Sequence, residues 1–394
     1  MGAQKLATIA VHAADYGSIA PAIPTVPPLH VATAFTFEDY ADLDKVFDDP
    51  REGYAYARFG NPTVRSLEAM MAALEGAEAS IAYPSGMAAV DGVFALYGTP
   101  GSHVLISRDV YGATLSLMRQ QYAQIGVTLH TVDATDLDDV RAQAEAYKPT
   151  LIHAEVISNP LMKVSDIAAL AEIAHANGAA LSVDNTFGTP ILTQPLAHGA
   201  DVVLHSTTKF IGGHGDVLGG VVSGSLDVIT KMRDRARTNG SVPGPFDAWL
   251  TVRGIHTLHL RMKAHSANAL AVAKWLQADD RIDAVHYPGL EPEHLASQFL
   301  SDDRGGLLSF EIRGATLESC GRYLEAVSLL KPATTLGDVS SVTLHPARSS
   351  HRGFTVAERA DWGIRDNLVR ISVGIEDVDD IIADLDQAIS AAIV

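Results

Sequence analysis

The chain has 394 residues, of which 47% are hydrophobic, and it carries a formal net charge of −18 at pH 7. That length allows two or three domains of roughly 100–200 residues each, and the apolar content excludes a globally disordered chain. The acidic balance argues against a nucleic-acid-binding surface, and the single cysteine, Cys320, excludes an internal disulfide.

No apolar run reaches the roughly 18 residues that a membrane-spanning helix requires. Residues 1–6 lack the long apolar stretch of a secretory signal peptide, and Leu6 stands where a myristoylation signal requires Ser or Thr. The lone cysteine is compatible with a reducing compartment. We therefore expect a cytoplasmic globular protein that binds neither membranes nor nucleic acid.

The first 60 residues are predicted to form an extended arm. Prolines interrupt any regular element there, at Pro21, Pro24, Pro27 and Pro28. The arm ends in residues 54–63, a segment dense in aromatic and turn residues. Tyr56 and Arg58 share strand parity, so in an extended chain both face one side. They could bind one phosphate of a neighbouring subunit, or they could belong to a packed arm with a surface arginine.

The middle of the chain alternates short apolar runs with helical periodicity. Leu151–Glu155 has the pattern of a buried strand, and apolar residues recur at i, i+3, i+4 and i+7 from Ile167 onward, as in an amphipathic helix. Ser165 is the predicted N-cap of that helix, and residues 180–183 form the next strand. Strand, helix and strand at this spacing predict right-handed βαβ units and a mostly parallel sheet.

Special residues follow several predicted strands at the point where each ends. Ser85, Gly86 and Met87 lie where a strand gives way to a helix, whose free N–H groups can bind an anion. Tyr111 and Asn159 follow two further strands. Since ligands bind beyond the carboxyl ends of strands in open α/β sheets, we expect these residues to lie together.

Asp184 directly follows a buried strand. A carboxylate about 4 Å from a protonated heteroaromatic nitrogen is worth about 4 kcal/mol at an effective dielectric near 20, or about three pKa units. Such a partner would keep a pyridine nitrogen protonated and make the ring an electron sink. The alternative is a structural aspartate that binds the adjacent turn at Asn185 and Thr186.

Lys209 follows the apolar run at residues 202–204 and a group of hydroxyl side chains. An amine that leaves a hydrophobic strand can form a Schiff base with an aldehyde cofactor, because desolvation lowers the pKa of lysine. The hydroxyls of Ser206 and Thr208 would add donors for a phosphate dianion. Alone, the segment also suits an ordinary lysine at the end of a strand.

The pattern changes near residues 240–245. A long helix is predicted over residues 246–277, and a strand over residues 368–375 presents Arg370 on the same side as Ser372. A guanidinium on a rigid strand matches the carboxylate of an amino-acid substrate in bidentate fashion. A salt-bridged structural arginine is the alternative.

The last helix places its apolar residues on one face, and its acidic residues are predicted to be solvated: Asp379, Asp380, Asp384 and Asp386. Three histidines upstream have spacings of three and six and no acidic ligand set: His256, His259 and His265. We therefore expect no metal site.

Together these segments resemble the Cys/Met-metabolism (trans-sulfuration) family of pyridoxal-phosphate enzymes, from about Thr8 to Glu376. The most specific stretches are residues 54–63, 184–187 and 205–216. The resemblance implies the α/β, fold-type-I aminotransferase-like architecture. An N-terminal arm with inter-subunit contacts (1–60) would precede a pyridoxal-phosphate-binding large domain with a mostly parallel sheet (61–250) and a smaller C-terminal α/β domain (251–394).

The resemblance also implies pyridoxal 5'-phosphate as cofactor and a homotetramer, a dimer of dimers with active sites shared between subunits. Its catalytic residues would be Lys209 as the Schiff-base lysine, Asp184 at the pyridinium nitrogen and Tyr111 stacked on the ring. The phosphate would bind at Gly86, Met87, Ser206 and Thr208, with Tyr56 and Arg58 from the adjacent subunit. The substrate carboxylate or the phenolic oxygen of the cofactor would meet Asn159, Ser341 and Arg370.

The similarity is closest in kind to methionine and cystathionine γ-lyases. It implies γ-elimination on methionine, homocysteine or cystathionine, giving 2-oxobutyrate, ammonia and a thiol. The alternative is γ-replacement on an O-acyl-homoserine, as in cystathionine γ-synthase or the homoserine sulfhydrylases. Ala113 stands where methionine γ-lyases usually carry cysteine, and Ser340 where many cystathionine-using members have a glutamate that meets the distal amine. A non-catalytic binding protein with this fold is a remote alternative.

Overall fold

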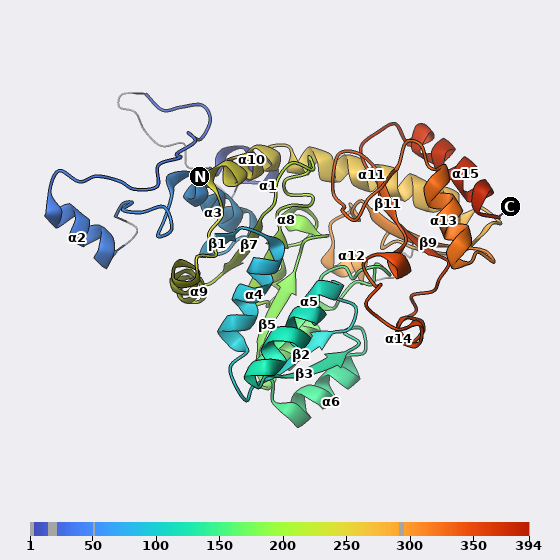
Figure 1. Ribbon diagram of the computed structural model, residues 1–394, viewed down its shortest axis with the longest axis horizontal. Helices are drawn as coiled ribbons and strands as arrows, with labels where there is room; N and C mark the ends of the chain where they lie inside the picture. The colour runs from blue at the N-terminus through green and yellow to red at the C-terminus, as the bar shows by residue number, and fades with distance from the viewer. Residues whose placement is uncertain (1–3, 15–21, 50–51, 291–294, 394) are drawn as a thin grey trace.

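The computed structural model describes residues 4–14, 22–49, 52–290 and 295–393 (Figure 1). Pro21 lies outside the described residues. Two sheets, each covered by helices, lie side by side, and a long N-terminal arm extends from the first of them. Within the described residues, no helix is both long enough and apolar enough to cross a membrane.

The first sheet has seven strands in the order β1-β7-β6-β5-β4-β2-β3. Their bounds are β1 Ala79–Tyr83, β2 His103–Ser107, β3 Thr128–Val132, β4 Leu151–Glu155, β5 Ala180–Asp184, β6 Val202–Ser206 and β7 Gly220–Gly224. Strand β7 pairs antiparallel with β1 and β6, whereas β2 to β6 pair in parallel. The prediction of a mostly parallel sheet is confirmed, and the carboxyl ends of β1, β2, β4, β5 and β6 meet at one edge.

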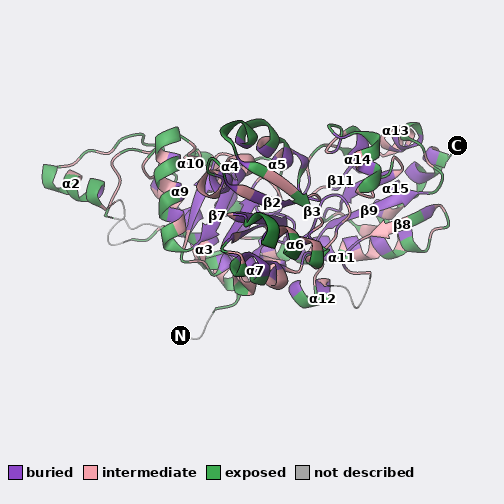
Figure 2. Cartoon of the chain, turned by 90° about the horizontal axis from the view of Figure 1, so that it is seen from below, coloured by how far each residue is buried: buried purple, intermediate pink, exposed green. Residues whose placement is uncertain are grey.

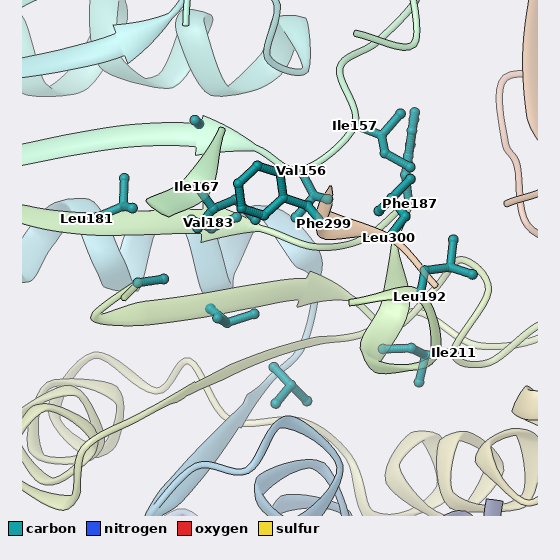
Figure 3. Packing of buried hydrophobic residues seen from close by; sticks show 14 of the residues in the cluster. Val156, Ile157, Ile167, Leu181, Val183, Phe187, Leu192, Ile211, Phe299 and Leu300 are labelled. Atoms are coloured by element: carbon teal, nitrogen blue, oxygen red, sulfur yellow. The ribbon is translucent and has the colours of Figure 1, made fainter. Parts of the chain in front are cut away.

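Both faces of this sheet are apolar, because residues along each strand alternate between two buried clusters. Leu105 and Val203 pack into one cluster, and their chain neighbours Ile106 and Leu204 pack into the other. The first cluster is covered mainly by α3 (Pro62–Glu75), α6 (Leu137–Tyr147), α7 (Ile167–Ala176) and α10 (Pro245–Ile255). The second is covered by α4 (Gly86–Tyr97), α5 (Gly112–Leu117) and α9 (Leu226–Asn239). Figure 3 shows residues of the first cluster at close range, among them Ile167, Val183 and Phe187.

The second sheet has five strands in the order β10-β11-β12-β9-β8. Their bounds are β8 Ile282–His286, β9 Leu307–Ile312, β10 Lys331–Pro332, β11 Val342–Leu344 and β12 Leu368–Ser372. A third apolar cluster joins this sheet to α11 (Leu258–Gln277), α13 (Leu317–Ala326) and α15 (Val378–Ile393). The predicted strand over residues 368–375 is therefore real but ends at Ser372.

The arm differs from the prediction, because it contains two helices, α1 (Leu6–His12) and α2 (Tyr40–Asp48). Helix α1 precedes the prolines, and α2 begins after them, capped by the Asp39 side chain. Helix α2 stands away from the body of the molecule (Figure 1), and most of its surface is exposed (Figure 2). Tyr40 is 84% exposed and Phe47 59%, so the arm presents aromatic side chains to its surroundings.

Two local predictions are wrong for identifiable reasons. The N-cap of α7 is Asp166, whose side chain accepts the N–H of Ala169, whereas the neighbouring Ser165 hydroxyl donates to the Glu155 carbonyl. The helix predicted over residues 246–277 is divided into α10 and α11. The break occurs near the end of α10, where the Gly254 carbonyl accepts a hydrogen bond of 2.7 Å from the Arg261 guanidinium.

Asp384 is also not solvated as predicted. Its carboxylate is buried and accepts backbone N–H groups from Ser328, Leu329 and Leu330, each at 2.9 Å. Although burial acts to raise the pKa of Asp384, these donors and the Ser328 hydroxyl hold it below its ordinary value. The last helix is thereby fixed to the chain that follows α13.

Candidate active site

A cavity of about 550 Å³ opens at the carboxyl edge of the large sheet, with walls from both sheets. Most of the predicted site residues line it: Gly86, Met87, Tyr111, Asn159, Asp184, Ser206, Thr208, Lys209 and Arg370. The ends of β4, β5 and β6 and the segments that follow β1 and β2 contribute to the wall, because these parallel strands terminate at the same edge. Ser341, Tyr56 and Arg58 are not part of this wall.

The start of α4 forms a cradle for an anion. Ser85 caps the helix, its Oγ accepting the N–H of Ala88 at 3.1 Å, and the first helical residue is Gly86. A Cβ at Gly86 would lie 2.8 Å from the Ser206 Cβ, so only glycine lets the end of β6 approach this closely. Backbone N–H groups of a 12-residue helix and the hydroxyls of Ser206 and Thr208 thus converge, which suits a phosphate.

Asp184 ends β5, and its Oδ1 accepts the N–H of Thr186 at 2.8 Å. Burial raises the pKa of this carboxyl, while the Thr186 hydrogen bonds and the neighbouring His205 act to lower it. A cation that lies against a buried carboxyl favours its ionised form. Asp184 therefore fits the protonated nitrogen of a heteroaromatic ring.

A buried polar group supports this strand end from beneath. Glu75, near the end of α3, places Oε1 2.6 Å from the Nε2 of His205 and 3.1 Å from the Asn185 amide nitrogen. Both members of the Glu75–His205 pair have fully buried side chains. The sequence does not indicate this group, since Glu75 lies 110 and 130 residues from its partners.

Lys209 leaves the end of β6 and directs its amine to the Thr335 hydroxyl, 3.2 Å away. Burial, and then the charge of Arg370, lower the pKa of the amine, whereas Asp338 acts to raise it. A lowered pKa increases the fraction of neutral, nucleophilic amine at physiological pH. Arg261 holds the next residues, donating to the carbonyls of Phe210 at 2.5 Å and Ile211 at 3.2 Å.

Arg370 projects from β12 toward the large sheet. Its Nη1 donates to the Asn159 side-chain oxygen at 2.9 Å and its Nη2 to the Thr335 carbonyl at 3.2 Å. Its buried Nε has no hydrogen-bond partner among the described residues, and burial lowers the pKa of the guanidinium to about 10. A guanidinium that is held by two neutral acceptors and keeps further N–H donors fits the carboxylate of an amino acid.

Glu155 is a cavity residue that the sequence analysis did not select. It accepts the backbone N–H of Tyr111 at 2.7 Å and lies beside Asp184 in the parallel register of β4 and β5. Burial, and then the charge of Asp184, raise its pKa well above the ordinary value. The available signal was its position, since Glu155 ends its strand as Asp184 ends the next.

Three predicted site residues, Ser341, Arg58 and Tyr56, lie outside the cavity wall. The Ser341 hydroxyl is buried, donating to Glu376 at 3.0 Å and accepting the Gly374 N–H at 2.8 Å. Arg58 donates to the Arg237 carbonyl and lies 4.7 Å from the centre of the Phe59 ring, and Tyr56 is 42% exposed. Among the described residues, no group of three or more His, Cys, Asp or Glu could hold a metal ion.

The cavity thus combines a buried amine, a buried carboxylate and a helix start that can bind a phosphate. A pyridoxal-phosphate-dependent enzyme requires these three groups. The chain belongs to the Cys/Met metabolism PLP-dependent enzyme family, whose family model matches residues 7–390. The predicted family and cofactor are thereby confirmed, and the protein is a pyridoxal-phosphate enzyme of trans-sulfuration.

Relatives within the family differ in their reactions. The chain is 42% identical over 367 residues to an O-succinylhomoserine sulfhydrylase from Pseudomonas aeruginosa, covering 92% of this chain and 90% of the relative. It is 40% identical to an L-methionine γ-lyase from Pseudomonas putida, covering 93% of each. A crystal structure of cystathionine γ-synthase from Xanthomonas oryzae pv. oryzae superimposes with a TM-score of 0.91 at 34% identity, covering 99% of this chain and 98% of that one. Family membership therefore covers both γ-elimination and γ-replacement.

Proposed function

We propose that the protein catalyses γ-elimination on a sulfur amino acid, namely methionine, homocysteine or cystathionine, releasing 2-oxobutyrate, ammonia and a thiol. The observation that supports this best is the convergence of Lys209, Asp184 and Arg370 on one cavity. When bound, pyridoxal phosphate supplies an electron sink for the α-carbon of the substrate.

The chain's own residues would divide the remaining work. Arg370 and Asn159 bind the α-carboxylate, and Asp184 keeps the ring nitrogen protonated. The Lys209 amine, with its lowered pKa, moves protons to and from substrate carbons. Tyr111 covers the ring and assists proton transfer to the leaving group, while Ser341, whose hydroxyl is bonded to Glu376 and Gly374, holds the chain that follows β12.

The second candidate is γ-replacement on an O-acyl-homoserine by a thiol. The sulfhydrylase from Pseudomonas aeruginosa favours it, as does a pair of arginines at the cavity wall, Arg348 and Arg352. Both reactions require the same handling of the α-carboxylate and the same proton transfers up to loss of the γ-substituent. They differ in whether water or a thiol completes the reaction.

One assay separates the two candidates. The holoenzyme is incubated with methionine, homocysteine, cystathionine, O-acetylhomoserine and O-succinylhomoserine, each with and without a thiol, and 2-oxobutyrate and thioether are measured. Keto acid from a sulfur amino acid supports elimination. Thioether from an acylated substrate, with negligible keto acid from the others, overturns the first proposal in favour of the second.

We further propose a cytoplasmic homotetramer in which Tyr56 and Arg58 complete the phosphate site of an adjacent subunit. The location of both residues outside their own chain's cavity supports this, as do the exposed aromatic residues of the arm. Arg58→Ala should weaken pyridoxal-phosphate retention at least about tenfold, because a charge-assisted hydrogen bond contributes about 1.5–3 kcal/mol. Equilibrium dialysis measures the change.

The matched control is Lys45→Ala, which removes an exposed cation from α2 of the same arm. It should leave cofactor retention and subunit assembly unchanged. If Arg58→Ala retains the cofactor as the wild type does, the arm does not serve the neighbouring site.

A further inference from the structure

One wall of the cavity carries positive charge that the steps assigned above to Lys209, Asp184 and Arg370 do not use. Residues 345–354, here called the basic segment, connect β11 to α14 (Val356–Asp361) through a short helical turn at Pro346–Arg348. Four of its residues line the cavity: Arg348, Ser349, Ser350 and Arg352.

The basic segment lies directly beside the reaction centre. A Cβ at Gly112 would come within 2.8 Å of the Ser350 carbonyl oxygen, so the backbone of the segment packs against the first turn of α5, next to Tyr111. His351 is buried, and burial together with the charge of Arg370 lowers its pKa to about 4. The segment therefore extends from the neighbourhood of the carboxylate-binding Arg370 to the exposed Arg352.

The two arginines of the basic segment, Arg348 and Arg352, are available to bind a ligand. Both are exposed, and within the part of the chain that the structure describes neither side chain makes a hydrogen bond or an ion pair. Two arginines further along the chain do pair with acids: Arg359 of α14 pairs with Asp366 at 3.1 Å, and Arg365, before β12, pairs with Glu311 at 2.9 Å. In a protein with a net charge of −18, unpaired cations at a substrate cavity call for an external anion.

The other charges of the cavity are already engaged deeper inside. Glu155 accepts the Tyr111 N–H and Asp184 the Thr186 N–H, and these two are the acids that line the cavity. Arg348 is directed partly away, since a Cβ at Gly321 of α13 would lie 3.6 Å from its Nη1. Arg352 is therefore the principal candidate for contact with a ligand, and Arg348 adds to the local potential.

We propose that Arg352, assisted by Arg348, selects substrates whose γ-substituent ends in a carboxylate. This inference rests on the proposed function only in requiring an amino-acid substrate with its α-carboxylate at Arg370. It favours an ester of homoserine with a dicarboxylic acid, or a thioether that carries a distal carboxylate, over methionine or an acetyl ester. Among the substrates of the first candidate reaction it therefore favours cystathionine, and among those of the second an ester with a dicarboxylic acid.

The test uses the holoenzyme and two unreactive amino acids of equal length. L-2-aminononanedioate carries a distal carboxylate, and L-2-aminononanoate lacks it. Titration of each against the absorption of the bound cofactor gives its dissociation constant without turnover. We expect the diacid to bind about three- to fivefold more tightly, and this preference to fall as salt rises.

Variants assign the preference to the segment. Arg352→Gln should reduce the preference to less than about twofold while leaving L-2-aminononanoate binding unchanged, and Arg352→Lys should retain most of it. Arg348→Gln should have a smaller effect. Arg365→Gln is the control, because that arginine is exposed but paired with Glu311.

Equal binding of the two ligands by the wild type, or an undiminished preference in Arg352→Gln, overturns the proposal. The proposed reaction fails by a different observation, the absence of 2-oxobutyrate and thioether from every substrate, which leaves the binding preference intact. If neither ligand perturbs the cofactor spectrum, the proposed carboxylate preference is rejected, whereas the proposed reaction is still judged by its products.

Discussion

Lys209→Ala is expected to abolish covalent attachment of the cofactor and to reduce kcat by at least about 10²–10⁴-fold. That range is the usual contribution of a positioned acid–base group. The loss should be large because, among the described residues, Lys209 is the one lysine that lines the cavity. Arg370, whose charge lowers the pKa of Lys209, cannot replace the amine, because its guanidinium is bound to Asn159 and Thr335.

Borohydride reduction followed by peptide mapping measures the attachment directly. Wild-type protein should yield a pyridoxyl peptide that contains Lys209, and the variant should yield none. Lys274→Ala, which changes an exposed lysine on α11, should behave as the wild type does. A pyridoxyl group on a different lysine of the wild-type protein would refute the assignment of Lys209.

Glu75→Ala is expected to lower the free energy of unfolding by about 3–5 kcal/mol, the cost of removing one partner from a buried pair. Oε1 of Glu75 serves both His205 and Asn185, so its removal leaves two buried donors without an acceptor. Because Asn185 follows Asp184 and His205 precedes Ser206, the variant should also retain pyridoxal phosphate less well.

Urea denaturation monitored by circular dichroism provides the measurement. Glu75→Gln keeps an acceptor at the same place and should lose only about 1–3 kcal/mol. Glu145→Ala removes an exposed carboxylate from α6 and should change stability by less than about 0.5 kcal/mol. A change below about 1 kcal/mol in Glu75→Ala would show that the pair does not stabilise the fold.

The parts of the site that could be predicted are those that local sequence encodes. Asp184 and Lys209 each follow a short apolar strand, and parallel strands deliver their carboxyl ends to one edge, so their proximity follows from topology. The glycine at position 86 was likewise predictable, because a helix start that binds an anion requires close backbone approach.

The parts that could not be predicted depend on contacts between distant segments. Thr335 meets the Lys209 amine across 126 residues, and Asp384 meets the backbone of residues 328–330 although its helical position suggested solvent. The choice between Ser165 and Asp166 as a cap had the same origin. Either side chain can cap a helix, and the Glu155 carbonyl decided the matter by accepting the Ser165 hydroxyl.

Arg261 has a mechanical consequence. It grips the carbonyls of Phe210 and Ile211 from α11, the same helix that packs against the second sheet through its later turns. Hydrogen bonds thus connect α11, which packs against the smaller sheet, to the backbone that follows Lys209. A rotation of the smaller sheet that narrows the cavity would therefore also displace the backbone next to Lys209. Closure over a substrate and reorientation of the Lys209 amine would then occur together.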